Sequence, residues 1–313
     1  MKWLKRIAKV LLGLFIFLLV AIFILLHAIR FYPTPKKLEK QFTKQGFDAP
    51  SMSIIDTENG ALTYVDNQVK SAAPTVVFIH GSPGSSQDFR LFFQDPELAN
   101  FHLISVNRLG YGKEDYGQNV VDLKQQAEAI AQVLSQLPED RQVIWVGHSY
   151  GGAPAAMCAA LNPEQTAGLI LAAAPMDPEH EHMFWFNPLF NSKPVRFFMP
   201  KMINMASDEK MTHEVELRKV ESYWAKITCP ITVLQGDKDF LSPMENLVYA
   251  QKMYENSAQL ITRELEDQDH FFPFSGKQVL KETILDMISP PELPSNPSTS
   301  FDFFPLPEPQ VSC

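Results

Sequence analysis

The stretch Trp145–Gly152, WVGHSYGG, places a serine between closely spaced glycines. Gly147 stands two residues before Ser149, and Gly151 stands two residues after it. The apolar run Val143–Val146 precedes them and reads as a strand. G-x-S-x-G between a strand and a helix is typical of a nucleophile in a sharp, strained turn, where the neighbouring residues must be small. The pattern therefore predicts a nucleophilic serine at Ser149.

A neutral serine hydroxyl is a weak nucleophile, so a base must take its proton. The chain has eight histidines, and His270 lies in EDQDHFFPF, after the last predicted strand and before the last predicted helix. The order Ser…Asp…His along the chain favours His270 as the base. His148 flanks the serine and is expected to point away into the sheet. His213 is expected to be solvated or part of an insertion.

Two stretches upstream of the serine strengthen this interpretation. Residues 80–84 read HGSPG, and residues 107–112 read NRLGYG. Together with the serine motif, they make residues 51–288 resemble the α/β-hydrolase family. The similar members carry an H-G-x-P-G loop, such as small esterases, epoxide-hydrolase-like enzymes and C–C hydrolases. The resemblance implies a structural role for His80, while Asn107 replaces the aspartate that usually opens the second stretch.

The resemblance also implies an acid that orients the base. VLQGDKDFLSP ends a predicted strand, and the family pattern G-x-x-D selects Asp239, three residues after Gly236, over Asp237. The other position used in the family follows the preceding strand, where Asp177 stands in APMDP, and this remains the alternative. The acid would hold the imidazole tautomer and stabilise the imidazolium.

Two backbone N–H groups are expected to form the oxyanion hole, those of Ser82 and Tyr150. Relatives that open epoxides or remove halide use an aspartate at the elbow, so Ser149 favours acyl chemistry. We expect hydrolysis of an ester or related acyl bond of a small, lipophilic substrate. An aminopeptidase and a C–C bond hydrolase on the same triad remain alternatives, because fold and triad do not choose the bond. A non-catalytic binding protein is the third.

The segments that would position these residues alternate between strand-like and helix-like runs. TVVFIHG, FHLISVN, QVIWVG, AGLILAAA and PITVLQG are continuously apolar, as strands buried on both faces must be. Helix-like runs separate them, which predicts an α/β fold with a doubly wound, mostly parallel sheet. The alternation stops over about 176–226, where Met and Phe are frequent, and this segment is expected to be a helical lid.

The N-terminal residues 1–30 contain the uncharged apolar run Val10–Leu26, bracketed by basic residues. Its length and the lack of a cleavage site favour an uncleaved transmembrane signal anchor over a signal peptide. Four basic residues lie on each side, and the N-terminal amine adds one positive charge to the first side, which favours a catalytic body on the non-cytoplasmic side. Residues 31–50 are expected to be a linker, and the Pro-rich residues 289–313 a disordered tail.

Composition excludes several other functions. The net charge is −9 although residues 1–30 hold only basic charges, so the remainder is too acidic for nucleic acid. Cys158, Cys229 and Cys313 are far apart, which makes a zinc site or a disulfide framework improbable. Cys158 and Cys229 are expected to be small core residues. GSPGSS lacks the G-K-[ST] of a phosphate loop, so we expect no cofactor and no metal.

Overall fold

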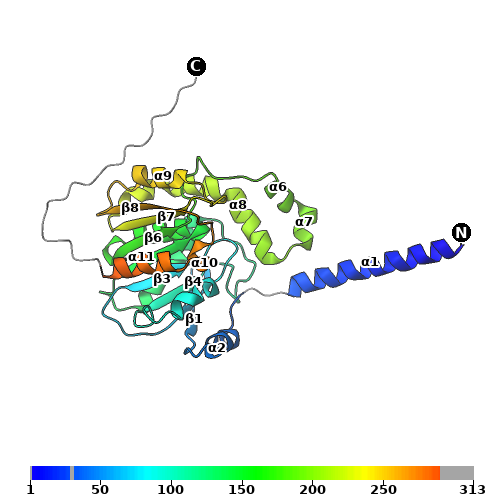
Figure 1. Ribbon diagram of the computed structural model, residues 1–313, viewed down its shortest axis with the longest axis horizontal. Coiled ribbons are helices and arrows are strands. Elements are labelled where there is room, and N and C mark those ends of the chain that lie inside the picture. Colours follow the sequence, from blue (N-terminus) through cyan, green and yellow to red (C-terminus); the bar gives the residue numbers. More distant parts are fainter. Residues whose placement is uncertain (1, 29–31, 290–313) are drawn as a thin grey trace, which may run out of the picture.

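An eight-stranded sheet forms the centre of the molecule (Figure 1). The computed structural model describes residues 2–28 and 32–289. The strands lie in the order β1-β2-β4-β3-β5-β6-β7-β8, with β2 antiparallel to both β1 and β4 and all other pairs parallel. The strand bounds are β1 Ser51–Thr57, β2 Gly60–Asp66, β3 Thr75–Ile79, β4 Leu103–Asn107, β5 Val143–His148, β6 Thr166–Ala172, β7 Ile231–Gly236 and β8 Leu260–Leu265. The predicted doubly wound, mostly parallel α/β fold is confirmed.

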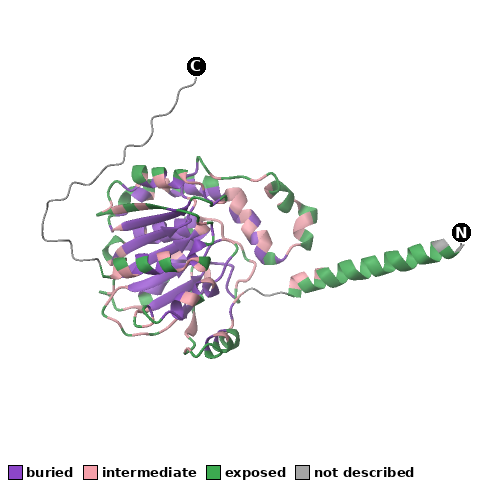
Figure 2. Cartoon of the chain, in the orientation of Figure 1, coloured by how far each residue is buried: buried purple, intermediate pink, exposed green. Residues whose placement is uncertain are grey.

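Helices cover both faces of this sheet, and its inner strands are almost wholly buried (Figure 2). Residues of three helices pack on one face: α4 Leu123–Ala131, α5 Gly152–Leu161 and α9 Glu245–Met253. Residues of four others pack on the opposite face: α2 Pro35–Thr43, α3 Arg90–Phe93, α10 Phe272–Ser275 and α11 Gln278–Ile288. Burial on both faces explains why the inner strands carry apolar residues without alternation.

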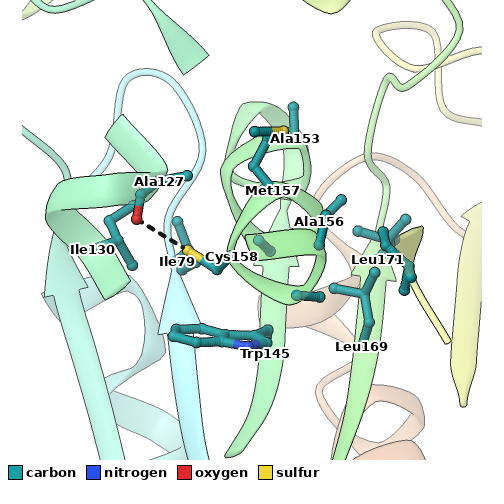
Figure 3. Packing of buried hydrophobic residues seen from close by; sticks show 14 of the residues in the cluster. Ile79, Ala127, Ile130, Trp145, Ala153, Ala156, Met157, Cys158, Leu169 and Leu171 are labelled. Atoms are coloured by element: carbon teal, nitrogen blue, oxygen red, sulfur yellow. Dashed lines mark hydrogen bonds between the residues drawn. The ribbon is translucent and has the colours of Figure 1, made fainter. Parts of the chain in front are cut away.

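The packing of α5 on the sheet shows how the core tolerates a few polar atoms (Figure 3). Trp145 of β5 is fully buried, and its indole N–H donates to Thr166 Oγ1 over 3.1 Å. Cys158 of α5 is also fully buried, and its thiol lies 3.4 Å from the backbone oxygen of Ala127. Cys158 and Cys229 are free and buried, as expected of small core residues, and Cys313 lies outside the described residues.

The expected lid consists of helices between β6 and β7. They are α6 Asn187–Phe190, α7 Lys193–Phe198, α8 Lys201–Val220 and the 3-10 turn η5 Glu221–Lys226. Leu217 and Val220, at the end of α8, join the main core, so this end of the helix is fixed. The short helices α6 and α7 have no buried residue and extend away from the sheet (Figure 2).

The segment 31–50, expected to be a linker, contains the helix α2 instead. Thr34 caps the helix, Pro35 occupies its first turn, and Leu38 and Phe42 are buried against the sheet. These two apolar residues are four positions apart, so they lie on one face of a helix. The prediction of a linker is therefore wrong for residues 35–43, because one apolar pair is enough to dock a short helix. The predicted tail, 289–313, lies outside the described residues except for Ser289.

One helix, α1 Lys2–Ala28, extends out from the body (Figure 1). Its segment Lys5–Ala28 is the one helix within residues 2–28 and 32–289 that is long and apolar enough to cross a membrane. The mean hydropathy of its most apolar window is 3.1, and none of that window is buried. The aromatic ring of Phe23 stacks on Phe197 of the lid, with centroids 5.2 Å apart.

Candidate active site

Ser149 lies directly after β5, at the start of the 3-10 turn η3 Ser149–Gly151 that leads into α5. Its φ of 52° is in the left-handed region, which is strained for a residue with a Cβ atom. A Cβ atom on Gly147 would lie 2.6 Å from the backbone oxygen of Gly151, and one on Gly151 would lie 2.5 Å from that of His80. Both glycines are therefore required by close backbone contacts, as the motif predicts.

A continuous hydrogen-bonded chain joins Ser149, His270 and Asp239. His270 Nε2 lies 2.9 Å from Ser149 Oγ, and His270 Nδ1 lies 2.8 Å from Asp239 Oδ2. The acid is buried and held by the turn after β7, where its Oδ1 accepts from the backbone N–H groups of Leu241 and Ser242, both over 2.9 Å. A carboxylate fixed in this way fixes the tautomer and the orientation of the imidazole.

The alternative acid, Asp177, lies elsewhere. Its Oδ2 is 2.7 Å from Nδ1 of His180, and its backbone N–H donates to Asn246. The structure thus brings Asp239 to the base His270 and gives Asp177 a different imidazole partner.

The loop after β3 passes close to the serine. A Cβ atom on Gly81 would lie 2.8 Å from Ser149 Cβ, so the backbone at Gly81 is in contact with the elbow. Ser82, whose N–H is an expected oxyanion donor, follows directly, and its Oγ lies 3.3 Å from the hydroxyl of Tyr111. Tyr150, the other expected donor, is part of η3 beside Ser149.

His148 and His213 are both buried, and His213 is part of the insertion, one of the two alternatives expected for it. His148 is buried as expected, but its Nε2 lies 3.1 Å from the backbone oxygen of His270, behind the base. Burial and the nearby His270 lower the pKa of His148 to about 3, so it is neutral. His213 belongs to lid helix α8 and is buried rather than solvated, with Nδ1 3.1 Å from Glu181 Oε2. Sequence patterns did not indicate this pair.

Two further buried residues were missed as well. Arg108 and Glu209 are fully buried and form an ion pair, with Arg108 Nη1 2.6 Å from Glu209 Oε1. Two signals were present in the sequence. Arg108 directly follows the buried strand β4, and Glu209 is an acid four residues after the buried Met205 of α8.

The serine opens into a cavity of about 960 Å³ between the sheet and the lid. Its apolar lining includes Phe184, Phe186, Phe190, Ile203, Leu241 and Phe274. The polar lining includes Ser149 and His270, and the lid residues Glu181, Lys210 and His213. Among the described residues, no group of three or more His, Cys, Asp or Glu could hold a metal ion.

Comparison with known proteins identifies the class. Residues 74–214 match the family model of the alpha/beta hydrolase fold. Methylesterase 3 of Arabidopsis thaliana is 24% identical over 259 residues, covering 68% of this chain and 95% of that protein. The chain thus has the α/β-hydrolase fold.

Solved structures agree on the fold. A membrane phospholipase A superposes with a TM-score of 0.59 at 20% identity, over 90% of this chain and 97% of that one. A putative aryl esterase from Burkholderia cenocepacia superposes with a TM-score of 0.61 at 15% identity, over 76% and 98% of the two chains. Together with the family match, these relatives support a hydrolase.

Proposed function

We propose that the protein is a membrane-anchored serine hydrolase that cleaves an ester of a lipophilic substrate. The observation that supports this most is the Ser149–His270–Asp239 chain of hydrogen bonds at a strained elbow. The elbow opens into a cavity lined largely by apolar side chains. The names of the relatives, a methylesterase and a phospholipase A, agree with ester chemistry.

The proposed mechanism assigns each proton to an atom. Ser149 Oγ attacks the ester carbonyl while His270 Nε2 takes its proton, and Asp239 stabilises the imidazolium. The N–H groups of Ser82 and Tyr150 stabilise the oxyanion of the tetrahedral intermediate. The intermediate collapses to an acyl-enzyme, and His270 gives its proton to the departing alcohol. Water, deprotonated by His270, then attacks the acyl-enzyme and releases the acid.

The preference for a lipophilic substrate rests on the lid. Phe184, Phe186 and Phe190 line the cavity, which has room for an acyl chain or an aromatic ring. The same lid also exposes large apolar side chains to solvent, two of which are among those that line the cavity. The exposed side chains are Met183, Trp185, Phe186, Leu189, Phe190, Phe197 and Phe198.

Membrane anchoring is proposed from α1 and from its contact with the lid. Phe23 lies near the C-terminal end of the apolar helix, stacks on Phe197 and meets the ring of Phe198 edge-on, with centroids 5.9 Å apart. Figure 1 shows α6 and α7 on the side of the body from which α1 extends. A bilayer around α1 would therefore face the exposed apolar side chains of the lid. We place the catalytic body on the non-cytoplasmic side, as the flanking basic residues favour.

The test uses the full chain in detergent, treated with a fluorophosphonate probe and a panel of nitrophenyl esters of increasing acyl length. We expect the probe to label Ser149, and turnover to rise with acyl length up to the size of the cavity. Ser149→Ala should abolish labelling and lower kcat by about 10⁶-fold. Ser135→Ala, at an exposed serine, is the matched control and should behave as the wild type.

A folded wild-type protein that is neither labelled nor active on any ester would contradict the proposal and favour a binding protein. Labelling of Ser149 together with turnover of only N-terminal peptide amides, or only of C–C bonds beside a carbonyl, would shift the assignment to the aminopeptidase or C–C hydrolase alternative.

A further inference from the structure

The fully buried Arg108 links the loop after β3 to the lid. Its Nε donates to the backbone oxygen of His80, and its Nη2 to that of Gly81, both over 3.0 Å. Its Nη1 and Nη2 also donate to the two carboxylate oxygens of Glu209 on α8, over 2.6 and 3.1 Å. Such two-pronged pairing needs the planar fork of a guanidinium. One side chain therefore holds a catalytic loop and a lid helix at once.

The loop contact fixes the peptide group that supplies one oxyanion donor. The Gly81 oxygen accepts from Arg108 and also lies 2.7 Å from His80 Nδ1. His80 Nε2 accepts the backbone N–H of Arg108 over 3.1 Å, so the neutral ring carries its proton on Nδ1 and donates it to Gly81. In a trans peptide the N–H points opposite to the C=O. Holding the carbonyl of Gly81 thus fixes the direction of the Ser82 N–H.

The same arginine contacts the residue that carries the second donor. The guanidinium carbon of Arg108 lies 4.5 Å from the ring centre of Tyr150 and 4.7 Å from that of Tyr111. The hydroxyl of Tyr111 donates to Glu209 Oε2 over 2.7 Å and lies 3.3 Å from Ser82 Oγ. Of the two residues with expected oxyanion donors, Tyr150 therefore contacts the buried ion pair directly, and Ser82 contacts it through Tyr111.

The buried charge of Arg108 is compensated by a carboxylate of the lid, that of Glu209. Burial by itself would lower the pKa of Arg108, but Glu209, and secondarily Tyr111, outweigh it and hold the pKa above its usual value. Removing the Glu209 charge would leave a buried cation without its ion partner, which is strongly unfavourable. The guanidinium, and with it the loop, would then have to rearrange.

We propose that Arg108 is a positioning residue for the oxyanion hole, and that Glu209 makes this hole depend on the seating of lid helix α8. The inference rests on the proposed serine hydrolase function. It predicts that breaking the ion pair weakens binding of the transition state more than binding of the substrate.

The test compares Glu209→Gln with the wild type. It uses the full chain and the nitrophenyl ester that the wild type hydrolyses with the highest kcat/KM. We expect kcat to fall about 10- to 100-fold, less than the roughly 10²- to 10³-fold cost of deleting one oxyanion donor, while KM stays within about threefold. An alkyl trifluoromethyl ketone, which forms a hemiketal oxyanion with Ser149, should lose affinity by the same factor as kcat/KM. Arg108→Lys keeps the charge but lacks the fork, and should show the same pattern.

A matched control is available on the same helix. Asp208 is the neighbour of Glu209 and pairs with Arg196 within the lid, with Arg196 Nη2 2.9 Å from Asp208 Oδ2. Asp208 also accepts from Asn119 Nδ2 of the body over 3.2 Å, a bond that an asparagine oxygen can keep. Asp208→Asn thus removes a lid ion pair without touching Arg108 or the loop after β3, so kcat should stay within about twofold of the wild type.

The proposal is wrong if Glu209→Gln changes only KM, if the ketone binds it as tightly as the wild type, or if Asp208→Asn loses as much kcat. Should Glu209→Gln not fold, Tyr111→Phe removes one hydroxyl between Glu209 and Ser82, and kcat should fall about threefold to tenfold with KM unchanged. Failure here, with a wild type that is labelled at Ser149 and active, would leave the hydrolase proposal standing.

Discussion

Two imidazoles line the same cavity, His270 on the core domain and His213 on the lid, and each is paired with a carboxylate. His270 Nδ1 lies 2.8 Å from Asp239, and His213 Nδ1 lies 3.1 Å from Glu181. All four side chains are at least nine-tenths buried. Identical chemistry at the Nδ1 side therefore does not decide which imidazole is the base.

The difference lies at the other nitrogen and around the acid. His270 Nε2 reaches the hydroxyl of Ser149, whereas His213 Nε2 has no hydrogen-bond partner among residues 2–28 and 32–289. The ring of His213 instead packs on that of Tyr150, with centroids 4.7 Å apart. Asp239 is held by backbone N–H groups, but Glu181 shares its charge with the flexible side chain of Lys210. We infer that His270, held by Asp239, is the catalytic base, and that the His213–Glu181 pair stabilises the position of the lid.

The largest expected effect comes from exchanging the two imidazoles for amides. His270→Gln should lower kcat/KM by about 10⁴-fold or more, because no group is left to take the serine proton. His213→Gln should cost less than about tenfold, because it changes the contacts with Tyr150 and Glu181 but removes no group that takes the serine proton. Steady-state kinetics on one ester measures both, and equal losses would contradict the distinction between the pairs.

Variants of the two candidate acids, Asp239 and Asp177, should also differ in kcat, but by a smaller factor than the two histidine variants. Asp239→Asn should lower kcat by about 10³- to 10⁴-fold, because an amide favours the wrong imidazole tautomer. Asp177→Asn is the matched control, since that carboxylate pairs with His180, and its kcat should equal that of the wild type. Full activity of Asp239→Asn together with loss in Asp177→Asn would reverse the assignment.

The His213–Glu181 pair of the lid should instead affect the free energy of unfolding and the way this free energy depends on pH. Burial would raise the pKa of Glu181, but His213 and Lys210 outweigh this and lower it below the usual 4.5. A lowered carboxyl pKa stabilises the fold above about pH 4.5, and this contribution is lost as pH falls through the folded-state value. Glu181→Gln should therefore cost roughly 1–3 kcal/mol at pH 7, and less near pH 3.

Denaturant unfolding at several pH values measures this difference. Glu214→Gln is the control, because Glu214 pairs with Arg218 on the exposed side of the same helix. It should change stability by less than about 0.5 kcal/mol. A pH-independent difference for Glu181→Gln would show that the carboxylate is not stabilised by its ion partners.

The sequence was informative where function depends on local geometry. The elbow around Ser149 and the strands that precede each functional residue follow from short patterns, and the structure joins Asp239 and His270 as the chain order predicts. Contacts between residues that are far apart in the chain leave no short pattern in the sequence from which they could be predicted. Arg108 and Glu209 are 101 positions apart, and the local signals at each residue do not link the one to the other. Only the packing of α8 in the folded chain shows that they form a pair.

The docking of α2 on the sheet shortens the connection to α1. Only seven residue steps separate Ala28 from Pro35, and they span roughly 25 Å at full extension. With α1 in a bilayer, as proposed, this tether would confine the cavity to a thin layer above the lipid headgroups. The enzyme would then respond to the surface density of its substrate rather than to its bulk concentration, and would reach only molecules that diffuse past its own anchor.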